Sequence, residues 1–370
     1  MATILTMLGT RPEIIKLSPL LPLLQERFTH VLVHSGQHYS FELDARFFAE
    51  LELPQPDYTL NVGSATHGEQ TARMLSRLEP ILLDIKPDAV LVQGDTNTTL
   101  AGALAAAKLQ IPVVHIEAGC RSFNRAMPEE LNRVLVDHIS TLLCAPDAAA
   151  VGHLLAEGIP AQQVALVGST SIDACERARG LAGRSNIIER LALLPGAYLA
   201  LTLHRAENTT PEVLPGILAA LAELAAAEPV VFPIHPRTAA ALQAQGLHLP
   251  PGVRPCEPLG YLDTLRLVGA ARALLTDSGG LQEEAAVLGT PALILRRETE
   301  WQALVDAGIH TLAGTSPETI LAAASVALRP EALAEARCRP LALRRGASQQ
   351  ICELVAELVA VARLAPAIAV

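Results

Sequence analysis

The chain of 370 residues is poor in aromatic side chains and in positive charge. Phe, Trp and Tyr together make up 3% of it, so stacked rings are not expected to form a carbohydrate platform. The formal net charge of -10 argues against non-specific binding to nucleic acid or to an anionic membrane. A local cationic pocket for a phosphate is still compatible with that total. A bound sugar would therefore be held mainly by hydrogen bonds and charges.

Paired cysteines and long apolar runs are also missing. The six cysteines stand singly, with no CxxC pair and no metal-ligand spacing, so we expect free thiols and no metal. The chain reaches Arg11 before the apolar part of a signal peptide would be complete. The most apolar later stretch, 214–234, is interrupted by Glu223 and Pro229, so we expect no membrane span. These features predict a cytoplasmic protein.

Short apolar runs alternate with helical patterns along the whole chain. We expect strands at Ile4–Leu8, His30–His34, Ala89–Val92, Val113–Ile116, Leu142–Cys144, Tyr198–Leu203, Val230–Ile234, Ala273–Thr276 and Ala292–Leu295. We expect helices at Pro12–Glu26, His67–Leu83, Thr98–Lys108, Pro211–Ala226, Tyr261–Gly269, Leu281–Leu288 and Gln349–Leu364. Apolar strands separated by amphipathic helices indicate βαβ units, and hence an α/β fold with doubly wound parallel sheets.

The length exceeds what one hydrophobic core usually serves, and the pattern restarts after Gly168. Residues 175–196 contain turn-forming pairs and look like a connection between the halves. We predict two Rossmann-like domains with a cleft between them, the first over residues 1–170 and the second over residues 171–350. Residues 351–370 form a last helical segment.

Polar motifs follow several expected strands, and ligands of open parallel sheets bind beyond the carboxyl ends of the strands. The first motif is Gly9-Thr10-Arg11-Pro12-Glu13. It opens a helix whose N-terminus favours an anion, and Arg11 and Lys16 add positive charge. An ordinary capped helix with solvated charged side chains would explain the same residues. The motif is not GxGxxG, so a dinucleotide site is not indicated.

Three carboxylates follow in the first half. Asp95 and Glu117 come after neighbouring expected strands, and Glu129 follows Met127 and Pro128. Grouped carboxylates raise one another's pKa, so one of them can hold a proton and the set can act as acid and base. Simpler explanations exist, because Asp95 could cap a helix and acids suit the first helical turn.

The second half supplies cations and hydrogen-bond donors. His204 and Arg205 follow one expected strand, and His235 follows the next. Single histidines are often structural, but two strand ends with His and Arg favour a site. Further on, Gly279 and Gly280 open a helix and expose N–H groups to a phosphate. One turn later, Glu284 can accept from a diol such as ribose. This division predicts a nucleotide-linked substrate.

In this order the motifs resemble the non-hydrolysing UDP-N-acetylglucosamine 2-epimerase family. The matching stretches are GTRPEIIKLSPL, GQHYSFEL, GDTNTTLAGALAA, HIEAGCRSFNRAMPEELNRVLVDH, HRAEN and DSGGLQEEA. The resemblance implies the glycosyltransferase-B architecture, with two Rossmann-like domains and a C-terminal helix returning to the first. It also implies a UDP-sugar substrate, no cofactor and a homodimer.

The reaction that the resemblance implies inverts carbon 2 of the sugar. A base removes the carbon-2 proton while UDP leaves carbon 1 to give a 2-acetamidoglucal, and UDP then adds back as the proton returns on the opposite face. By motif, Asp95, Glu117 and Glu129 resemble the acid–base carboxylates, with no single proton assigned, and His204 resembles the residue that supports UDP departure. The expected substrate and nucleotide contacts are Arg11, Lys16, Gln37, Arg205, His235, Ser278, Gly279, Gly280 and Glu284.

Three departures from the family pattern concern substrate and regulation. Thr299-Glu300-Trp301 is more similar to epimerases acting on UDP-2,3-diacetamido-2,3-dideoxyglucuronate, whereas Gly9–Glu13 favours UDP-N-acetylglucosamine. Gln37 matches the first glutamine of an activating substrate site, but its partners fall on Ser40 and Ser64, so we expect weak or absent activation by substrate. The family's Tyr-Gly-Asp-Gly reads Leu-Arg-Arg-Gly at 343–346.

Other functions remain open at this point. The same site would release N-acetylmannosamine and UDP if water captured the intermediate. A retaining glycosyltransferase shares the architecture, but three carboxylates suited to proton transfer argue against it. A binding module without catalysis is the simplest alternative.

Overall fold

The computed structural model describes residues 1–37, 41–341 and 344–364. The chain divides into two compact units, which we call the N-terminal unit (Met1–Ala174 with Leu343–Val370) and the C-terminal unit (Cys175–Ala342). The sequence predicts boundaries near residues 170 and 350, and the structure has them at 174/175 and 342/343. Each unit is described by itself below.

The N-terminal unit is built on one sheet of seven strands. In sequence they are β1 (Thr3–Leu8), β2 (Thr29–His34), β3 (Tyr58–Thr59), β4 (Ala89–Gln93), β5 (Val113–Ile116), β6 (Leu142–Ala145) and β7 (Val164–Leu166). Their order in the sheet is β3-β2-β1-β4-β5-β6-β7, and every pairing is parallel. Because the order reverses at β1, the loops after β1 and β4 lie at the switch point where such sheets bind ligands.

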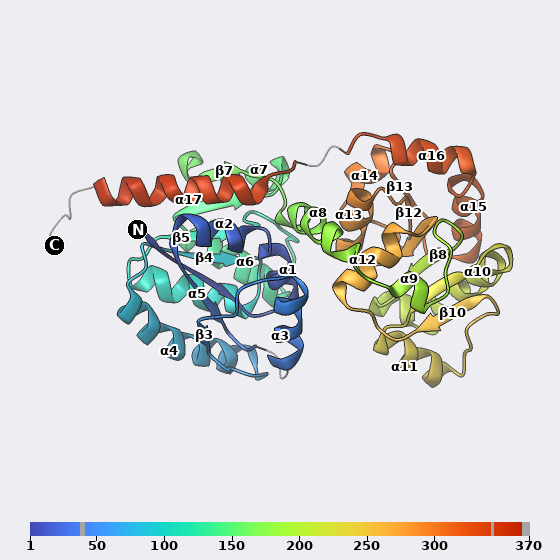
Figure 1. Ribbon diagram of the computed structural model, residues 1–370, viewed down its shortest axis with the longest axis horizontal. Helices are drawn as coiled ribbons and strands as arrows, with labels where there is room; N and C mark the ends of the chain where they lie inside the picture. Colours follow the sequence, from blue (N-terminus) through green and yellow to red (C-terminus); the bar gives the residue numbers. More distant parts are fainter. Residues whose placement is uncertain (38–40, 342–343, 365–370) are drawn as a thin grey trace. The chain divides into compact units, whose positions relative to one another are not determined.

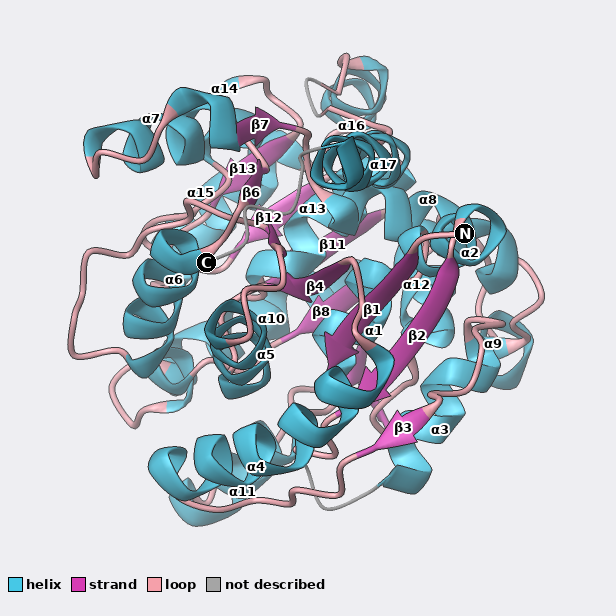
Figure 2. Ribbon diagram, turned by 90° about the vertical axis from the view of Figure 1, so that its left-hand side faces the viewer, coloured by secondary structure: helices cyan, strands magenta, loops and turns pink. Residues whose placement is uncertain are grey.

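Helices cover both faces of this sheet, with α2 and α17 on one side of β1 and β2 and with α4 and α5 on the other (Figure 2). The helices are α1 (Arg11–Leu17), α2 (Leu20–Arg27), α3 (Phe41–Glu50), α4 (His67–Ile85), α5 (Asn97–Lys108), α6 (Pro128–Ile139), α7 (Ala148–Ala156) and α17 (Ala347–Leu364), and the unit also includes the first residues, 170–174, of α8 (Thr170–Ala182). A short 3-10 turn, η1, covers Ala161–Gln163. The chain's last described helix, α17, packs against α2 (Figure 1).

The start of α17 is fixed within the N-terminal unit. The carboxylate of Asp173, on α8, accepts hydrogen bonds from the backbone N–H of Gly346 at 2.9 Å and of Ser348 at 2.7 Å. The segment that departs from the family's Tyr-Gly-Asp-Gly therefore anchors the returning helix, although Leu343 lies outside the described residues.

The C-terminal unit has a sheet of six parallel strands in the order β10-β9-β8-β11-β12-β13. The strands are β8 (Leu199–Thr202), β9 (Val230–Pro233), β10 (Val253–Cys256), β11 (Ala273–Thr276), β12 (Ala292–Ile294) and β13 (His310–Leu312). The helices are α9 (Ile187–Arg190), η2 (Ala206–Thr209), α10 (Leu214–Ala227), α11 (Pro236–Gln245), α12 (Tyr261–Gly269), α13 (Gly279–Leu288), α14 (Gln302–Asp306), α15 (Pro317–Ala327) and α16 (Pro330–Cys338). The doubly wound α/β prediction is confirmed for both units.

All nine expected strands are present, and the four that sequence missed are the outer strands of the two sheets. These are β3 and β7 in the first sheet and β10 and β13 in the second. Each has at most four residues and only one or none that is buried. An edge strand faces one neighbour and partly faces solvent, so it lacks the continuous apolar run that identified the inner strands.

Two helix predictions need correction. The helix expected at Pro12–Glu26 is two helices, because Pro19 has no N–H with which to continue the ladder of α1. The segment 175–196, expected to be a connection, is largely helical and contains the end of α8 and all of α9. All six cysteines are free, as expected. Within the described ranges, every helix is too short or too polar to cross a bilayer.

Candidate active site

Two of the predicted carboxylates follow adjacent strands of the N-terminal unit. Glu117 comes directly after β5, in the left-handed backbone region with φ +69°. Its carboxylate contacts the Nζ of Lys16 at 2.6 Å and accepts a hydrogen bond from the side-chain amide of Gln93, the last residue of β4. Lys16 therefore pairs with a carboxylate, and the Glu117 side chain is fixed between two donors.

Asp95 stands beside this group at the turn between β4 and α5. Its Oδ2 contacts Nη1 of Arg133 at 2.5 Å, and a third of its side chain is exposed. Burial raises the pKa of Asp95, and the charges of Glu117 and Glu129 raise it further, although Arg133 and Lys16 oppose them. A carboxyl with a raised pKa beside charged neighbours is suited to exchanging a proton near neutral pH.

The first turn of α6 carries two glutamates with different surroundings. Glu130 is buried and accepts hydrogen bonds from the N–H groups of Ser122 and Phe123, so its pKa is lowered to about 2 despite burial. Glu129 is exposed, yet its charge acts on Asp95. Glu130 therefore fixes the preceding loop, while Glu129 stays available to a ligand.

Two side chains on α6 that sequence assigned no role position Asp95. The amide of Asn132 donates to the backbone oxygen of Asp95 at 2.8 Å, and Arg133 holds its carboxylate. Both lie within one turn of Glu129 on the same helix. Residues three or four apart share a helix face, so their spacing from Glu129 is the sequence feature that could have identified them as site residues.

The anion site expected at the start of α1 is filled by the chain itself, which corrects that prediction. The carboxylate of Glu13 accepts from the N–H groups of Gly9 at 2.8 Å and Thr10 at 2.7 Å. It also accepts from the hydroxyl of Thr96 at 2.7 Å and is buried. Glu13 thus ties the β1–α1 turn to the β4–α5 turn, and the N–H groups of Gly9 and Thr10 are already used.

The remaining predicted residues of this unit lie around the same end of the sheet. The guanidinium of Arg11 stands 5.5 Å from the ring centre of Phe47. The side-chain oxygen of Gln37 accepts from the hydroxyl of Thr98 at 2.8 Å. Ser40, which was weighed as part of an activating site, lies outside the described residues.

In the C-terminal unit the predicted residues gather around a carboxylate that sequence overlooked. Asp277, fully buried after β11, accepts from the backbone N–H groups of His204 and Arg205 at 2.9 Å each. It also contacts Nδ1 of His204 at 3.0 Å and accepts from the amide of Asn208 at 3.2 Å. Burial raises the pKa of Asp277, but these donors outweigh it and the pKa is lowered. Asp277 thereby fixes the His204 ring through its Nδ1.

His235 lies next to His204, with ring centres 5.6 Å apart. Its Nδ1 accepts from the backbone N–H of Arg237 at the start of α11, and the Arg237 side chain donates to the backbone oxygen of His204 at 2.8 Å. Burial lowers the pKa of His235, and the neighbouring cations lower it further. Near neutral pH the His235 ring is therefore neutral, and because its Nδ1 accepts, its Nε2 carries the proton and is a donor.

The glycine-rich motif opens α13 as predicted. The hydroxyl of Ser278 caps the helix and accepts from the N–H of Leu281 at 3.4 Å, and Gly279 and Gly280 form its first turn. A Cβ on Gly279 would stand 2.5 Å from Oε1 of Glu300, a carboxylate that also contacts Arg205 at 3.3 Å. The uncovered backbone at a helix N-terminus beside an arginine is suited to a diphosphate.

Two further residues border this helix. The indole N–H of Trp301 donates to the backbone oxygen of Gly279 at 3.0 Å. Glu284, the expected ribose acceptor, lies on α13 beside Tyr261, and its charge contributes, after burial, to raising the pKa of that phenol. The segment Glu298–Trp301, which we call the ETEW segment, thus packs on the helix whose N-terminus is the candidate phosphate site.

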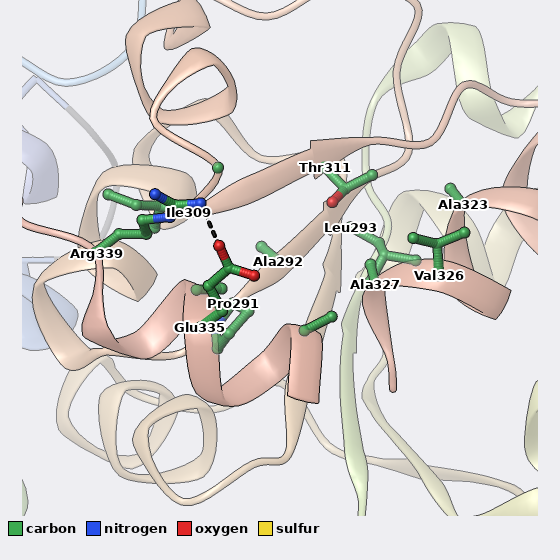
Figure 3. Close-up of a pocket in the computed structure, with 13 residues that line it drawn as sticks. Pro291, Ala292, Leu293, Ile309, Thr311, Ala323, Val326, Ala327, Glu335 and Arg339 are labelled. Atoms are coloured by element: carbon green, nitrogen blue, oxygen red, sulfur yellow. Dashed lines mark hydrogen bonds and ion pairs between the residues drawn. The ribbon is translucent and has the colours of Figure 1, made fainter. Parts of the chain in front are cut away.

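Two of the cavities among the described residues of the C-terminal unit have no lining residue in common. One, of about 490 Å³, borders the motif residues and is lined by Arg205, Glu207, Asn208, Val213, Arg296, Arg297, Glu298 and Thr315. The other, of about 220 Å³, lies over β13 between α15 and α16, where mainly apolar side chains and the Glu335–Arg339 pair line it (Figure 3). It holds none of the predicted site residues.

The described residues contain no cluster of His, Cys, Asp and Glu suited to a metal ion.

Comparison with known proteins decides the family. The family model described as UDP-N-acetylglucosamine 2-epimerase matches residues 23–356. The chain belongs to this family. It is therefore an epimerase, and a curated UDP-N-acetylglucosamine 2-epimerase from Methanococcus maripaludis is 47% identical over 328 residues, covering 85% of this chain and 88% of the relative.

Another relative of this chain is named for a different substrate. A UDP-2,3-diacetamido-2,3-dideoxy-D-glucuronate 2-epimerase of Pseudomonas aeruginosa is 43% identical over 331 residues, covering 88% of this chain and 92% of the relative. Among solved structures, the Methanocaldococcus jannaschii UDP-GlcNAc 2-epimerase in complex with UDP-GlcNAc and UDP superposes with a TM-score of 0.80 at 42% identity, over 96% of this chain and 99% of that one.

A more distant structure bears on the fold alone. UGT2 of Phytolacca americana, a glycosyltransferase, superposes with a TM-score of 0.61 at 14% identity over 97% of this chain and 100% of that one. The predicted glycosyltransferase-B architecture is thereby confirmed.

Proposed function

We propose that the protein interconverts UDP-N-acetylglucosamine (UDP-GlcNAc) and UDP-N-acetylmannosamine without releasing free sugar. The observation that carries the proposal is the group of Asp95, Glu117 and Glu129, in which burial and like charge raise the pKa of Asp95. Inversion at carbon 2 needs a proton removed from one face and returned to the other, which such a group can do. The names of the relatives support the same reaction.

The proposed steps divide between the two units. A carboxylate of the N-terminal unit takes the carbon-2 proton while the bond from carbon 1 to the UDP oxygen breaks, which leaves 2-acetamidoglucal and UDP. In the C-terminal unit His204, fixed by Asp277, supports the departing diphosphate, and Ser278 with the first turn of α13 holds its phosphates. UDP then adds back at carbon 1 as the proton returns on the opposite face.

The nucleotide contacts proposed for the C-terminal unit follow from the same geometry. Arg205 and His235 stand beside His204 and supply positive charge or N–H donors. Glu284 accepts from the ribose. From the N-terminal unit, Arg11 and Gln37 are further proposed contacts, whereas Lys16 acts through its pair with Glu117.

The test is carbon-2 exchange in deuterated water. The protein is incubated with UDP-GlcNAc, and carbon 2 is followed by NMR. Deuterium at carbon 2 together with UDP-N-acetylmannosamine is the expected result. Free N-acetylmannosamine and UDP would show a hydrolysing enzyme instead, and absence of exchange and products would overturn the proposal.

A second substrate has a specific observation in its favour. Thr299 and Trp301 of the ETEW segment contact α13, and the relative from Pseudomonas aeruginosa acts, by its name, on UDP-2,3-diacetamido-2,3-dideoxy-D-glucuronate. The same exchange experiment with that sugar nucleotide compares the two substrates by kcat/KM. We expect UDP-GlcNAc to have the higher value.

We also propose that the active form is a homodimer, as in the family that the sequence resembles. Sedimentation equilibrium at several protein concentrations measures the mass directly. A mass equal to that of one chain throughout would contradict the proposal.

A further inference from the structure

His115 lies on β5, two residues before Glu117, and its side chain is completely buried. Both nitrogens of its ring contact oxygen atoms. Nδ1 lies 2.6 Å from Oδ1 of Asp137, and Nε2 lies 2.8 Å from the backbone oxygen of Gly94. A backbone carbonyl can only accept a hydrogen bond, so Nε2 must carry a proton.

The other contact depends on the charge of Asp137. Its Oδ2 accepts from the backbone N–H of Gly119 at 3.1 Å and contacts Nη2 of Arg121 at 2.7 Å, so every partner of this carboxyl is a donor or the His115 ring. Burial raises the pKa of Asp137, but the contacts with His115 and Arg121 outweigh it and the pKa is lowered. The permanently charged guanidinium of Arg121 and the N–H of Gly119 favour the ionised carboxylate whatever the charge of His115. An ionised Asp137 has no proton to give, so Nδ1 must carry one as well.

We infer that His115 is a buried imidazolium that positions Asp95 by donating from Nε2 to the carbonyl of Gly94. A neutral ring would turn a lone pair toward either the Asp137 carboxylate or the Gly94 oxygen, and buried repulsion of that kind is costly. The charge is compensated within the fold, because Asp137 and Arg121 face it and Glu157 pairs with Arg121 at 2.7 Å.

The position of Gly94 shows why this contact matters for the site. Gly94 is in the left-handed region with φ +76° and immediately precedes Asp95. Its N–H donates to the backbone oxygen of Ile116 at 3.0 Å, its carbonyl accepts from His115, and the next carbonyl, that of Asp95, accepts from Asn132. The turn that presents Asp95 is therefore held at consecutive peptide groups, and His115 supplies one of these contacts. His115 touches no proposed substrate atom, so it is a positioning residue.

The charge on the ring has a direct spectroscopic test that needs no substrate. Protein labelled with ¹⁵N-histidine gives long-range ¹H–¹⁵N spectra in which an imidazolium shows two protonated nitrogens and a neutral ring shows one. The signals of His115 are those missing from a His115→Gln variant. Two protonated nitrogens at neutral pH are expected, and one unprotonated nitrogen in the His115 ring would overturn the inference.

The positioning role is tested by kinetics, and this part rests on the proposed epimerase function. In His115→Gln the side-chain donors sit on one atom and cannot bridge Asp137 and Gly94. Misplacement of a reacting group by a fraction of an ångström to 1 Å can cost about a hundredfold in rate, so we expect kcat to fall about a hundredfold with little change in KM. His138→Gln is the matched control, since His138 lies on α6 next to Asp137 but is half-exposed and 3.3 Å from Glu157.

A second variant separates the contact from the charge and remains informative if His115→Gln does not fold. In Asp137→Asn the amide oxygen can accept from Gly119 and Arg121 while the amide NH₂ donates to Nδ1 of a neutral His115, which keeps Nε2–H on Gly94. We expect one protonated ring nitrogen and a loss of kcat below about tenfold. A folded His115→Gln with unchanged kcat, or an Asp137→Asn that loses as much as His115→Gln while keeping Nε2–H, would overturn the positioning role. If wild-type protein shows no carbon-2 exchange, the proposed function fails, and the ring spectrum still decides the charge.

Discussion

Each unit has an aspartate after an equivalent strand, but the pKa values of the two aspartates are shifted in opposite directions. Asp95 follows β4 and Asp277 follows β11, and each of these strands lies beside the first strand of its sheet, β1 or β8. The pKa of Asp95 is raised, whereas that of Asp277 is lowered. The difference comes from the donors: two backbone N–H groups and an amide fix Asp277, while Asp95 has one arginine and two like charges nearby. Position in the fold alone does not decide the chemistry of a carboxylate.

The residues that follow the next strand of each sheet, β5 and β12, also differ between the units, because they carry opposite charges. Glu117 stands after β5, and Arg296 stands after β12, where it pairs with Glu300. The N-terminal unit therefore gathers acids at its strand ends and the C-terminal unit gathers cations. Because the loop residues of the two units differ, the N-terminal unit carries groups suited to proton transfer and the C-terminal unit carries groups suited to a diphosphate.

The largest expected effect tests the acid–base side of this comparison. Asp95→Asn removes the carboxyl with the raised pKa and keeps its shape. If Asp95 takes part in moving the carbon-2 proton, exchange into UDP-GlcNAc falls by about 10²–10⁴-fold. Deuterium incorporation measured by NMR under single-turnover conditions checks it.

Asp84→Asn is the control for this change, because Asp84 is an exposed carboxylate on α4 in the same unit. We expect that variant to exchange at the wild-type rate. Full exchange activity in Asp95→Asn would remove the main catalytic assignment.

The next effect is on stability and has opposite signs in the two units. Asp277→Asn turns an NH₂ group toward backbone donors, and leaving buried groups unsatisfied costs about 1–3 kcal/mol. Asp95→Asn removes a partly desolvated charge, so we expect the free energy of unfolding to stay unchanged or to rise. Urea unfolding of both variants and wild type at neutral pH measures the difference.

The pH dependence of the same variants follows from the directions of the pKa shifts. The pKa of Asp277 is lowered from its ordinary 3.8, so its stabilisation is present above that pH and is lost as pH falls through the folded-state pKa. The pKa of Asp95 is raised from 3.8, so its charge destabilises the fold increasingly as pH rises from 3.8 through the folded-state pKa. Relative to wild type, Asp95→Asn should therefore gain stability with rising pH, and a loss would contradict the comparison.

Much of the fold could be predicted from the sequence because the inner strands are continuous apolar runs. The motif residues were found for a related reason, since polar residues directly after a buried strand mark the ligand edge of a sheet. Asp95 and Glu117 are therefore adjacent in the structure, and Ser278 caps α13 beside the two predicted glycines.

The rest depended on contacts distant in sequence. Glu13 looked like an ordinary first-turn acid, but its buried bonds to Gly9, Thr10 and Thr96 fill the expected anion site. Asp277 stood inside a recognised motif, yet its role rests on the backbone of His204, 73 residues away. Such partners are fixed by sheet topology, which local pattern does not contain.

A smaller effect distinguishes the glycines that open a helix in each unit. A Cβ on Gly9 would stand 1.8 Å from Oγ of Ser35 and 2.5 Å from Oγ1 of Thr98, and both hydroxyls are buried. Gly9→Ala should therefore cost about 1–3 kcal/mol. In Gly279→Ala the methyl group meets the half-exposed carboxylate of Glu300, which can move, so stability should change by no more than about 0.5 kcal/mol.

We also expect the two glycine variants to differ in their affinity for UDP. Gly279→Ala should weaken UDP binding in calorimetry, because the methyl group stands at the candidate phosphate site. Folded Gly9→Ala should bind UDP like wild type, since Glu13 already uses the N–H groups of that turn. Equal UDP affinity in both variants would show that the anion site is not at α13.

The smallest effect concerns regulation, where the sequence departs from its family. Gln37 is bonded to Thr98, and the positions of its partners in the activating site of some bacterial members fall on Ser40 and Ser64. Because serine cannot supply the long amide and guanidinium donors of that site, Gln37→Ala should leave the dependence of rate on UDP-GlcNAc hyperbolic, as in wild type. Initial rates over a wide substrate range check this. Sigmoidal kinetics in wild type that Gln37→Ala abolishes would contradict the expectation of weak or absent activation by substrate.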